Sequence, residues 1–290
     1  MAQQISDPNE WTIPAHNPVT LFCSPEAVEF YKTWMEEDSV MNEQPKILAS
    51  FASTFMSNAF FLCRCGSDPL YLDKALPFMV AALEYAHTGN EPGRDTKAIE
   101  IEGMGVFIAN NPVNYLAENP DLWIEAMSIA TVRKNKRAQE KLAALPHSLF
   151  KELPGMLHRN YFVRAWQQLH KGDPALQHLF EEAHEAALHR SPVKGTIGQF
   201  ALWLDIPKID VLKAIAFKDA EHIDEKLANA FRLHRKFYDR AVVLNKGDLP
   251  LRESDKGILP LQLAAMLQLA REHFPSCKVS TEYAPDWLFK

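Results

Sequence analysis

The sequence predicts an all-α protein, an irregular multi-helix domain of stacked helical hairpins with about 10–12 helices and a short extended C-terminal tail. Three observations lead to this prediction. Apolar residues recur at spacings of three and four along nearly the whole chain, as on one face of a helix. Pairs that start helices, such as Ser24-Pro25 and Asn119-Pro120, precede several of these segments. No stretch of six residues alternates β-branched side chains, so a substantial sheet is not expected.

The predicted elements divide the chain into an arm and one large helical domain. Residues 1–24 are polar and contain Pro14 and Pro18, which predicts an extended N-terminal arm. Residues 25–290 are expected to form a single domain, with a proline-rich junction at 145–155 as a candidate internal boundary. The tail at 277–283 alternates loosely, as an extended piece would. Helices are expected, in order, over residues 25–35, 45–66, 69–86, 97–109, 120–130, 136–144, 161–171, 174–189, 207–217, 222–243 and 259–273.

Acidic residues are concentrated in one segment near the N-terminus. The 290 residues carry 31 Lys and Arg against 37 Asp and Glu, a net charge of −6, which argues against a general nucleic-acid binder. Six of the acids lie between residues 26 and 43 and face only one base, Lys32. The segment is either a solvated helix face or a surface that steers a basic protein partner, with two aromatic residues as anchors. The candidate partner-binding residues are Glu29, Tyr31, Trp34, Glu36, Glu37, Asp38 and Glu43.

The cysteines and the apolar segments bear on the compartment. Cys63 and Cys65 form a C-x-C pair, while Cys23 and Cys277 stand apart, and this spacing matches neither a zinc ribbon nor a redox C-x-x-C motif. All four are therefore expected to be free thiols. The N-terminus lacks the basic and apolar regions of a signal peptide, and no segment reaches the ~20 apolar residues of a membrane span. These features predict a cytoplasmic protein without membrane contacts.

Patterns for catalysis or metal binding are sparse. His184 and His189 are five residues apart, so they point about 140° apart on a helix and cannot chelate one zinc ion. The pairs Glu181–His184 and Asp219–His222 have the i, i+3 spacing that di-metal carboxylate proteins use. Solvated charge and helix capping explain both pairs as well, so no cofactor is expected. A helical di-metal enzyme that uses these four residues is kept as the alternative.

Two further features are expected to be structural. His234 lies on the apolar face of its helix, where a histidine is more often a hydrogen-bonded core residue than a catalyst. The run at 133–141 holds five bases and one acid without interleaved aromatic residues. It is therefore expected to be a solvated helix face, with anion contact as the alternative.

Several segments resemble one protein family. Residues 121–133 resemble a "W..AL.LA…R" block, and the Leu-Ala-Ala-Leu-Pro of 142–146 follows at the expected place. Residues 226–238 resemble an "N.AL..AL..H+.YW" helix, while 259–270 and 280–285 resemble a closing "LALA.LA" helix and an "ESEYLP" tail. In this order and spacing the segments are similar to Immunity protein 49, an all-α family encoded beside polymorphic toxins. The resemblance reaches from about residue 45 to residue 288.

This resemblance implies a binding protein and not an enzyme. The implied partner is the C-terminal domain of a cognate secreted antibacterial toxin, delivered by contact-dependent or type VI secretion. The toxins associated with the family include deaminases and nucleases, which implies a nucleic-acid-targeting enzyme that acts in the cytoplasm. Neutralisation would block the active site of the toxin or its access to substrate, without direct nucleic-acid binding by the immunity protein. A helical scaffold for an unrelated partner is a further alternative.

The residues shared with the family have a different expected role from the toxin contacts. Trp123, Pro146, His234 and Tyr283 lie on apolar helix faces or at helix ends, so they are expected to be structural. Contacts with the toxin are expected on exposed, variable surfaces instead.

Overall fold

The computed structural model describes residues 11–17, 23–36, 48–66, 68–88, 96–110, 119–150, 157–171, 176–190, 199–244, 246 and 250–290. Helices account for most of these residues and the strands are short, which confirms the predicted all-α class. None of the described helices is both long enough and apolar enough to cross a membrane. The chain divides into two compact units, and the ends of the chain cross between them. The N-terminal unit is Thr20–Ala183 with Asp286–Lys290, and the C-terminal unit is His184–Pro285 with Met1–Val19.

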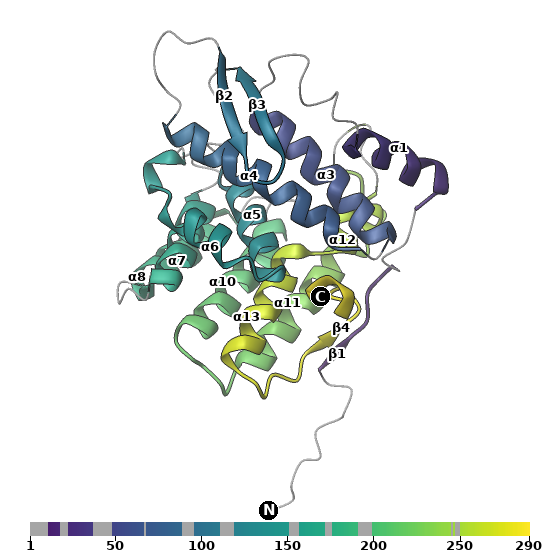
Figure 1. Cartoon of the computed structure of the whole chain (residues 1–290). Helices are drawn as coiled ribbons and strands as arrows, with labels where there is room; N and C mark the ends of the chain where they lie inside the picture. Colours follow the sequence, from purple (N-terminus) through teal and green to yellow (C-terminus); the bar gives the residue numbers. More distant parts are fainter. Residues whose placement is uncertain are drawn as a thin grey trace, which may run out of the picture. The chain divides into compact units, whose positions relative to one another are not determined.

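The N-terminal unit is built around a helical hairpin. Helices α3 (Leu48–Gly66) and α4 (Leu70–Thr88) pack side by side, as Figure 1 shows, and α1 (Pro25–Glu36) packs on α3. The rings of Phe51, Phe55, Phe78 and Phe107 form a core cluster with centroids 4.8–6.3 Å apart. The unit continues with β2 (Thr96–Ile101), β3 (Gly105–Asn110), α5 (Pro120–Val132), α6 (Lys136–Ala144), η1 (His147–Leu149), α7 (Leu157–Lys171), the first part of α8 (Leu176–Arg190) and the terminal turn η4 (Asp286–Phe289).

Local capping explains where α5 and α6 begin. The side chain of Asn119 accepts a hydrogen bond from the backbone N–H of Asp121, at 2.9 Å, and Pro120 follows as the first helical residue. Asn135 does the same for α6, since it accepts from the backbone N–H of Ala138 at 3.0 Å. Side-chain caps of this kind satisfy N–H groups that have no partner inside the helix. Both starts were predictable because the cap lies within three residues of the group it binds.

The helix predicted over residues 97–109 is wrong, because this segment is a β-hairpin. Strands β2 and β3 pair antiparallel, with Ile99 opposite Phe107. Gly103 and Gly105 have positive φ angles of 73° and 93°, which glycine adopts without steric cost and which close the turn. Ile101, Phe107 and Ala109 are buried while their neighbours are more exposed, which is the alternation of a strand. The two glycines therefore mark a turn and not a weak helix.

The C-terminal unit combines helices with a two-stranded parallel pairing of distant segments. It contains the rest of α8, the π-helical turn η2 (Ala201–Asp205), α10 (Ile206–Ala216), α11 (Ile223–Tyr238), η3 (Leu251–Glu253), α12 (Asp255–Ile258) and α13 (Leu261–His273). Strand β1 (Thr12–Ile13) pairs with β4 (Ser280–Thr281), and Figure 1 shows the two strands side by side. The short extended tail is thus confirmed. Helix α11 ends at Tyr238, five residues before the predicted end at residue 243.

Part of the expected N-terminal arm is fixed on the C-terminal tail. The backbone N–H of Ala15 donates to Glu282 at 2.9 Å, and that of His16 donates to the hydroxyl of Tyr283 at 3.1 Å. The hydroxyl of Thr281 donates to the carbonyl of Ile13 at 2.7 Å. Residues more than 260 positions apart in the chain are therefore tied together by hydrogen bonds, a contact that no local sequence pattern indicates.

His234 is a buried core residue, as predicted. Its Nε2 atom lies 2.9 Å from the carbonyl oxygen of Gly257, and its ring packs against Tyr238 and Tyr283 at 4.6 and 5.1 Å. Gly257 allows this packing, because a Cβ atom there would lie 2.5 Å from the ring of Tyr238. Burial lowers the pKa of His234 to about 3, against the raising effect of the hydrogen bond to Gly257.

The buried His234 predicts a loss of stability in acid. The unfolded chain takes up a proton at this residue below pH 6.5, whereas the folded protein keeps it neutral down to about pH 3. The free energy of unfolding should therefore fall as the pH drops through this window, by up to about 1.4 kcal/mol per pH unit from His234. Urea titrations at pH 7 and pH 5 should show a smaller drop for His234→Gln than for the wild type. The control is His222→Gln, because the pKa of exposed His222 is raised by its hydrogen bond to Asp219. Equal pH dependence of wild type and His234→Gln would refute this account.

Candidate partner-binding surface

Helix α1 carries the described part of the acidic segment and rests on α3 through one face. The hydroxyl of Ser24 accepts a hydrogen bond from the backbone N–H of Ala27 at 3.2 Å, which caps the helix. The ring of Tyr31 lies 4.9 Å from that of Phe61. The ring of Trp34 lies 5.8 and 5.9 Å from two core rings of α3, and Met35 is buried. Tyr31 and Trp34 were expected to be exposed anchors, but both are half-buried and hold α1 in place.

The opposite face of α1 is exposed and contains an aromatic residue that the sequence reasoning missed. The exposed positions follow one another at spacings of three and four, so they form one stripe. Phe30 is 64% exposed in the middle of this stripe. The spacing of the helix could have revealed its position, because Phe30 does not share the face on which Tyr31, Trp34 and Met35 lie. The stripe, called the α1 face below, consists of Glu26, Glu29, Phe30, Thr33 and Glu36.

The carboxylates of the α1 face act together with a carboxylate at the start of α4. Tyr71 is buried, and burial raises its pKa, with further raising effects from Glu36, Asp68 and Glu29. These three carboxylates are thus close enough to the same phenol to act on it electrostatically. The ammonium of Lys74 lies 5.5 Å from the centre of the Tyr71 ring.

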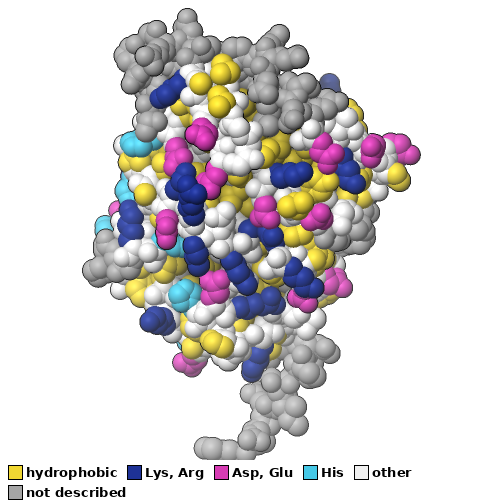
Figure 2. Space-filling view, viewed as in Figure 1, with side chains coloured by type: hydrophobic (Ala, Val, Ile, Leu, Met, Phe, Trp, Pro, Cys, Tyr) yellow, Lys and Arg dark blue, Asp and Glu magenta, His cyan; other side chains and the backbone are white. Residues whose placement is uncertain are grey.

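The α1 face therefore combines exposed negative charge with an exposed apolar side chain. Among the described residues, Glu26, Glu29 and Glu36 form no ion pair. Figure 2 shows acidic side chains and a hydrophobic one together at the position of α1 on the right of the view. An exposed aromatic ring ringed by unpaired carboxylates can be covered by a partner with a basic rim and an apolar recess. The other three candidate residues, Glu37, Asp38 and Glu43, lie outside the described residues.

A disulfide ties the start of α1 to the end of α3. Cys23 and Cys65 are bonded, so the expectation of four free thiols is wrong for this pair. The C-x-C spacing explains which cysteine takes part, because two residues turn a helix by about 200° and place Cys63 and Cys65 on opposite sides. Cys63 is a buried free thiol whose pKa is raised by burial, while Cys65 is on the side that meets Cys23. Sequence spacing could not reveal the pair, because only the packing of α1 on α3 brings the two residues together.

The residues of the di-metal alternative are engaged in local contacts. Glu181 accepts a hydrogen bond from Gln177 at 2.9 Å, and His184 lies 3.9 Å from Asp210. The carboxylate of Asp219 binds His222 at 2.8 Å and Lys226 at 3.1 Å, and it also accepts from the backbone N–H of His222 at 3.3 Å. No group of three or more His, Cys, Asp or Glu residues in the described part of the chain could hold a metal ion. Asp219 and His222 thus bind each other at the turn before α11, and Asp219 also binds Lys226.

Three of the five bases in the run at 133–141 form ion pairs within the N-terminal unit. Arg133 forms a bidentate ion pair with Asp73, with both N–O distances at 2.9 Å, and it also donates to the carbonyl of Leu288. Arg137 pairs with Glu102 at 2.5 Å, and Lys141 pairs with Glu84 at 3.4 Å. These ion pairs join α6 and the end of α5 to neighbouring elements, while Lys134, Lys136 and Arg137 are exposed, as expected for a solvated helix face.

Comparison with known proteins places the chain in a family. Residues 31–288 match the family described as Immunity protein 49. Searches of curated proteins and of solved structures find no match. The matched span begins within α1, so Glu26, Glu29 and Phe30 precede it. Because the match covers most of the chain, this protein belongs to the Immunity protein 49 family, whose members are immunity proteins directed against toxins.

Proposed function

We propose that this protein binds the C-terminal domain of a cognate secreted antibacterial toxin through the α1 face and neutralises it without catalysis. The observation that carries the proposal is Phe30, an exposed ring among carboxylates that form no ion pair with any described residue, on a helix anchored to α3 by its other face. Aromatic residues at the centre of an interface supply much of the binding energy. Family membership supports the toxin as the partner.

The anchoring of α1 favours tight binding. One end of the helix is fixed by the disulfide between Cys23 and Cys65, and Tyr31 and Trp34 fix the rest against α3. A surface that is rigid before binding loses less conformational entropy when the complex forms. The two aromatic residues thus contribute by positioning Phe30 and the carboxylates.

The charge of the α1 face supports a nucleic-acid-targeting enzyme as the toxin. Such an enzyme needs a basic surface to bind the phosphate backbone of its substrate. Glu26, Glu29 and Glu36 would pair with the same basic side chains that otherwise bind phosphates, and this would block access of the substrate. The immunity protein itself then needs no contact with nucleic acid or with a membrane. Polymorphic toxins delivered by type VI secretion are the proposed source of such a domain.

Two features of this protein point to different cellular compartments. A toxin that attacks nucleic acid acts in the cytoplasm, so its antidote is proposed to act there too. A disulfide such as Cys23–Cys65, however, persists mainly in oxidising compartments. Alkylation of thiols in intact cells, followed by mass spectrometry of the tryptic peptides, decides between them. An oxidised Cys23–Cys65 pair in the cells would contradict the cytoplasmic location.

Copurification tests the proposed function. The toxin domain encoded beside this gene, inactivated in its catalytic site, should copurify with the tagged full-length protein in one-to-one ratio. The substitution Phe30→Ser should weaken the complex, whereas Phe217→Ser, at an exposed phenylalanine of the C-terminal unit, should leave it intact. Failure of the wild type to form a complex with the neighbouring toxin would sink the proposal.

A further inference from the structure

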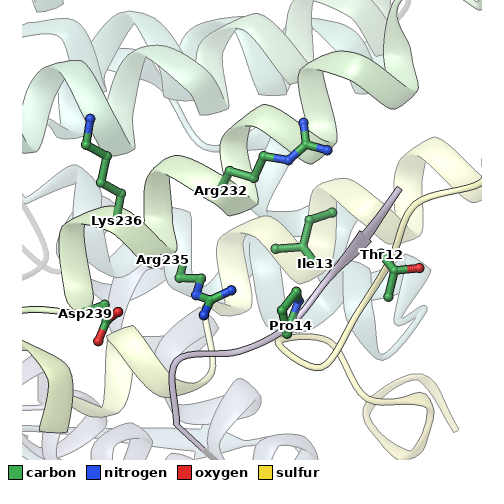
Figure 3. A pocket seen from close by; sticks show the side chains of 7 residues that line it. All are labelled: Thr12, Ile13, Pro14, Arg232, Arg235, Lys236 and Asp239. Carbon is green, nitrogen blue, oxygen red and sulfur yellow. The ribbon is translucent and has the colours of Figure 1, made fainter. Parts of the chain in front are cut away.

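The C-terminal unit has a surface hollow of about 430 Å³ between α11 and the N-terminal arm. Residues 12–14, from β1 and the proline after it, form one wall. Arg232, Arg235 and Lys236 line the hollow from α11, together with Asp239 just past the end of the helix. Figure 3 shows the side chains. A volume of this size can accept several atoms of a bound chain or a small ligand.

The cations of the hollow repel one another within one helix. Arg235 and Lys236 follow Arg232 at spacings of three and four, so the three residues occupy neighbouring positions on α11. Like charges at these spacings destabilise a helix. Among the described residues that line the hollow, Asp239 is the one acid against three bases, which gives a net charge of +2. A negatively charged group that enters the hollow would reduce the repulsion between these bases.

Arg235 is the cation best placed to hold such a group. In Figure 3 its guanidinium extends from α11 toward Pro14, whereas Lys236 extends away from β1. Lys236 lies over the ring of Trp203, 4.5 Å from the ring centre. Arg235 is half-buried, and no described residue accepts a hydrogen bond from its guanidinium. An arginine has five N–H donors in a fixed fork that fits a carboxylate, so these donors are available to a ligand.

We propose that the hollow binds an acidic peptide segment of a protein partner, with a carboxylate of the segment on Arg235. The presence of Asp239 favours a peptide over a simple anion as the ligand. It repels a phosphate ion, but it can accept a hydrogen bond from a backbone N–H of a peptide whose carboxylates meet the cations. Ile13, which is buried in the wall, adds an apolar surface beside these charges. The hollow belongs to the C-terminal unit and has the opposite charge to the α1 face, so this proposal does not depend on the proposed function.

Fluorescence anisotropy with labelled peptides tests this proposal on the full-length protein. Capped hexaglutamate should bind at low ionic strength and capped hexaglutamine should not. Arg235→Gln should weaken hexaglutamate binding about tenfold or more, the effect of losing a charge-assisted hydrogen bond. Arg137→Gln, which makes the same change of charge in the N-terminal unit, should change the affinity less than about twofold, because Arg137 is exposed and does not line the hollow. Thermal unfolding of both variants confirms that they are folded.

The opposing outcomes are equally definite. The proposal fails if hexaglutamate does not bind, or if Arg235→Gln binds it as well as the wild type does. Equal losses in Arg235→Gln and Arg137→Gln would show that only net charge matters, which also overturns it. Inorganic phosphate that displaces the peptide at the peptide's own concentration would identify a site for simple anions and not for a peptide.

Discussion

Reduction of the Cys23–Cys65 disulfide is expected to lower the free energy of unfolding of the N-terminal unit by about 4 kcal/mol. The bond closes a segment with a sequence separation of 42, and cross-linking a loop of that length restricts the unfolded chain by about this amount. The effect should be local at first, because the bond joins the residues just before α1 to the end of α3. Hydrogen exchange of the backbone amides in α1 should accelerate on reduction.

Urea titrations with and without dithiothreitol measure this effect, with fluorescence of the tryptophans as the signal. The double variant Cys23→Ser, Cys65→Ser is the matched control, since it should resemble the reduced wild type and respond no further to dithiothreitol. If reduction left both the stability and the exchange of α1 unchanged, the bond would have no part in holding the helix.

Substitutions on the α1 face should produce the largest change in toxin binding. Phe30→Ser should weaken the affinity about 30-fold or more, mainly through faster dissociation, as expected when a central aromatic contact is lost. Glu29→Lys with Glu36→Lys should instead slow association about tenfold at low salt, with a smaller effect at high salt, because steering by exposed charge is screened. The two kinds of substitution therefore separate the apolar contact from the electrostatic one.

Surface plasmon resonance with the inactivated toxin domain gives both rate constants. The control for the charge reversal is Glu140→Lys with Glu185→Lys, which changes the net charge equally at exposed positions outside the α1 face. An equal loss of association rate in the control would mean that only the overall charge of the protein matters. If Phe30→Ser dissociated from the toxin as slowly as the wild type, Phe30 would not be part of the interface.

The features of this fold that depend on interactions between residues close together in the chain could be predicted from the sequence. The starts of α5 and α6 depend on Asn119 and Asn135, whose side chains cap the next turn, so each is visible in the chain itself. The core position of His234 follows in the same way from the apolar face of its helix. Features that join distant segments could not be predicted. The pairing of β1 with β4 and the bond between Cys23 and Cys65 exist only because packing brings the partners together.

For the candidate surface, too, local features could be predicted and features that depend on packing could not. The acidic character of α1 could be read from the composition, but the choice between its two faces needs the helix to be docked on α3. Tyr31 and Trp34 were selected as anchors for their type, whereas Phe30 lies on the exposed side. The hairpin of β2 and β3 was missed for a related reason, since Gly103 and Gly105 disfavour a helix but also suit a turn. The alternating burial of the flanking residues distinguishes a hairpin from a weak helix, and this burial depends on packing against the neighbouring core.

The central claim is that the α1 face neutralises a toxin, and protection of living cells tests it most directly. Cells that express the active toxin domain encoded beside this gene are supplied with the wild type, with the triple variant Glu29→Lys, Phe30→Ser, Glu36→Lys, or with Glu140→Lys, Glu185→Lys. Wild type and control should restore growth, while the triple variant, folded and present at the same level, should not. Full protection by the triple variant would contradict the claim.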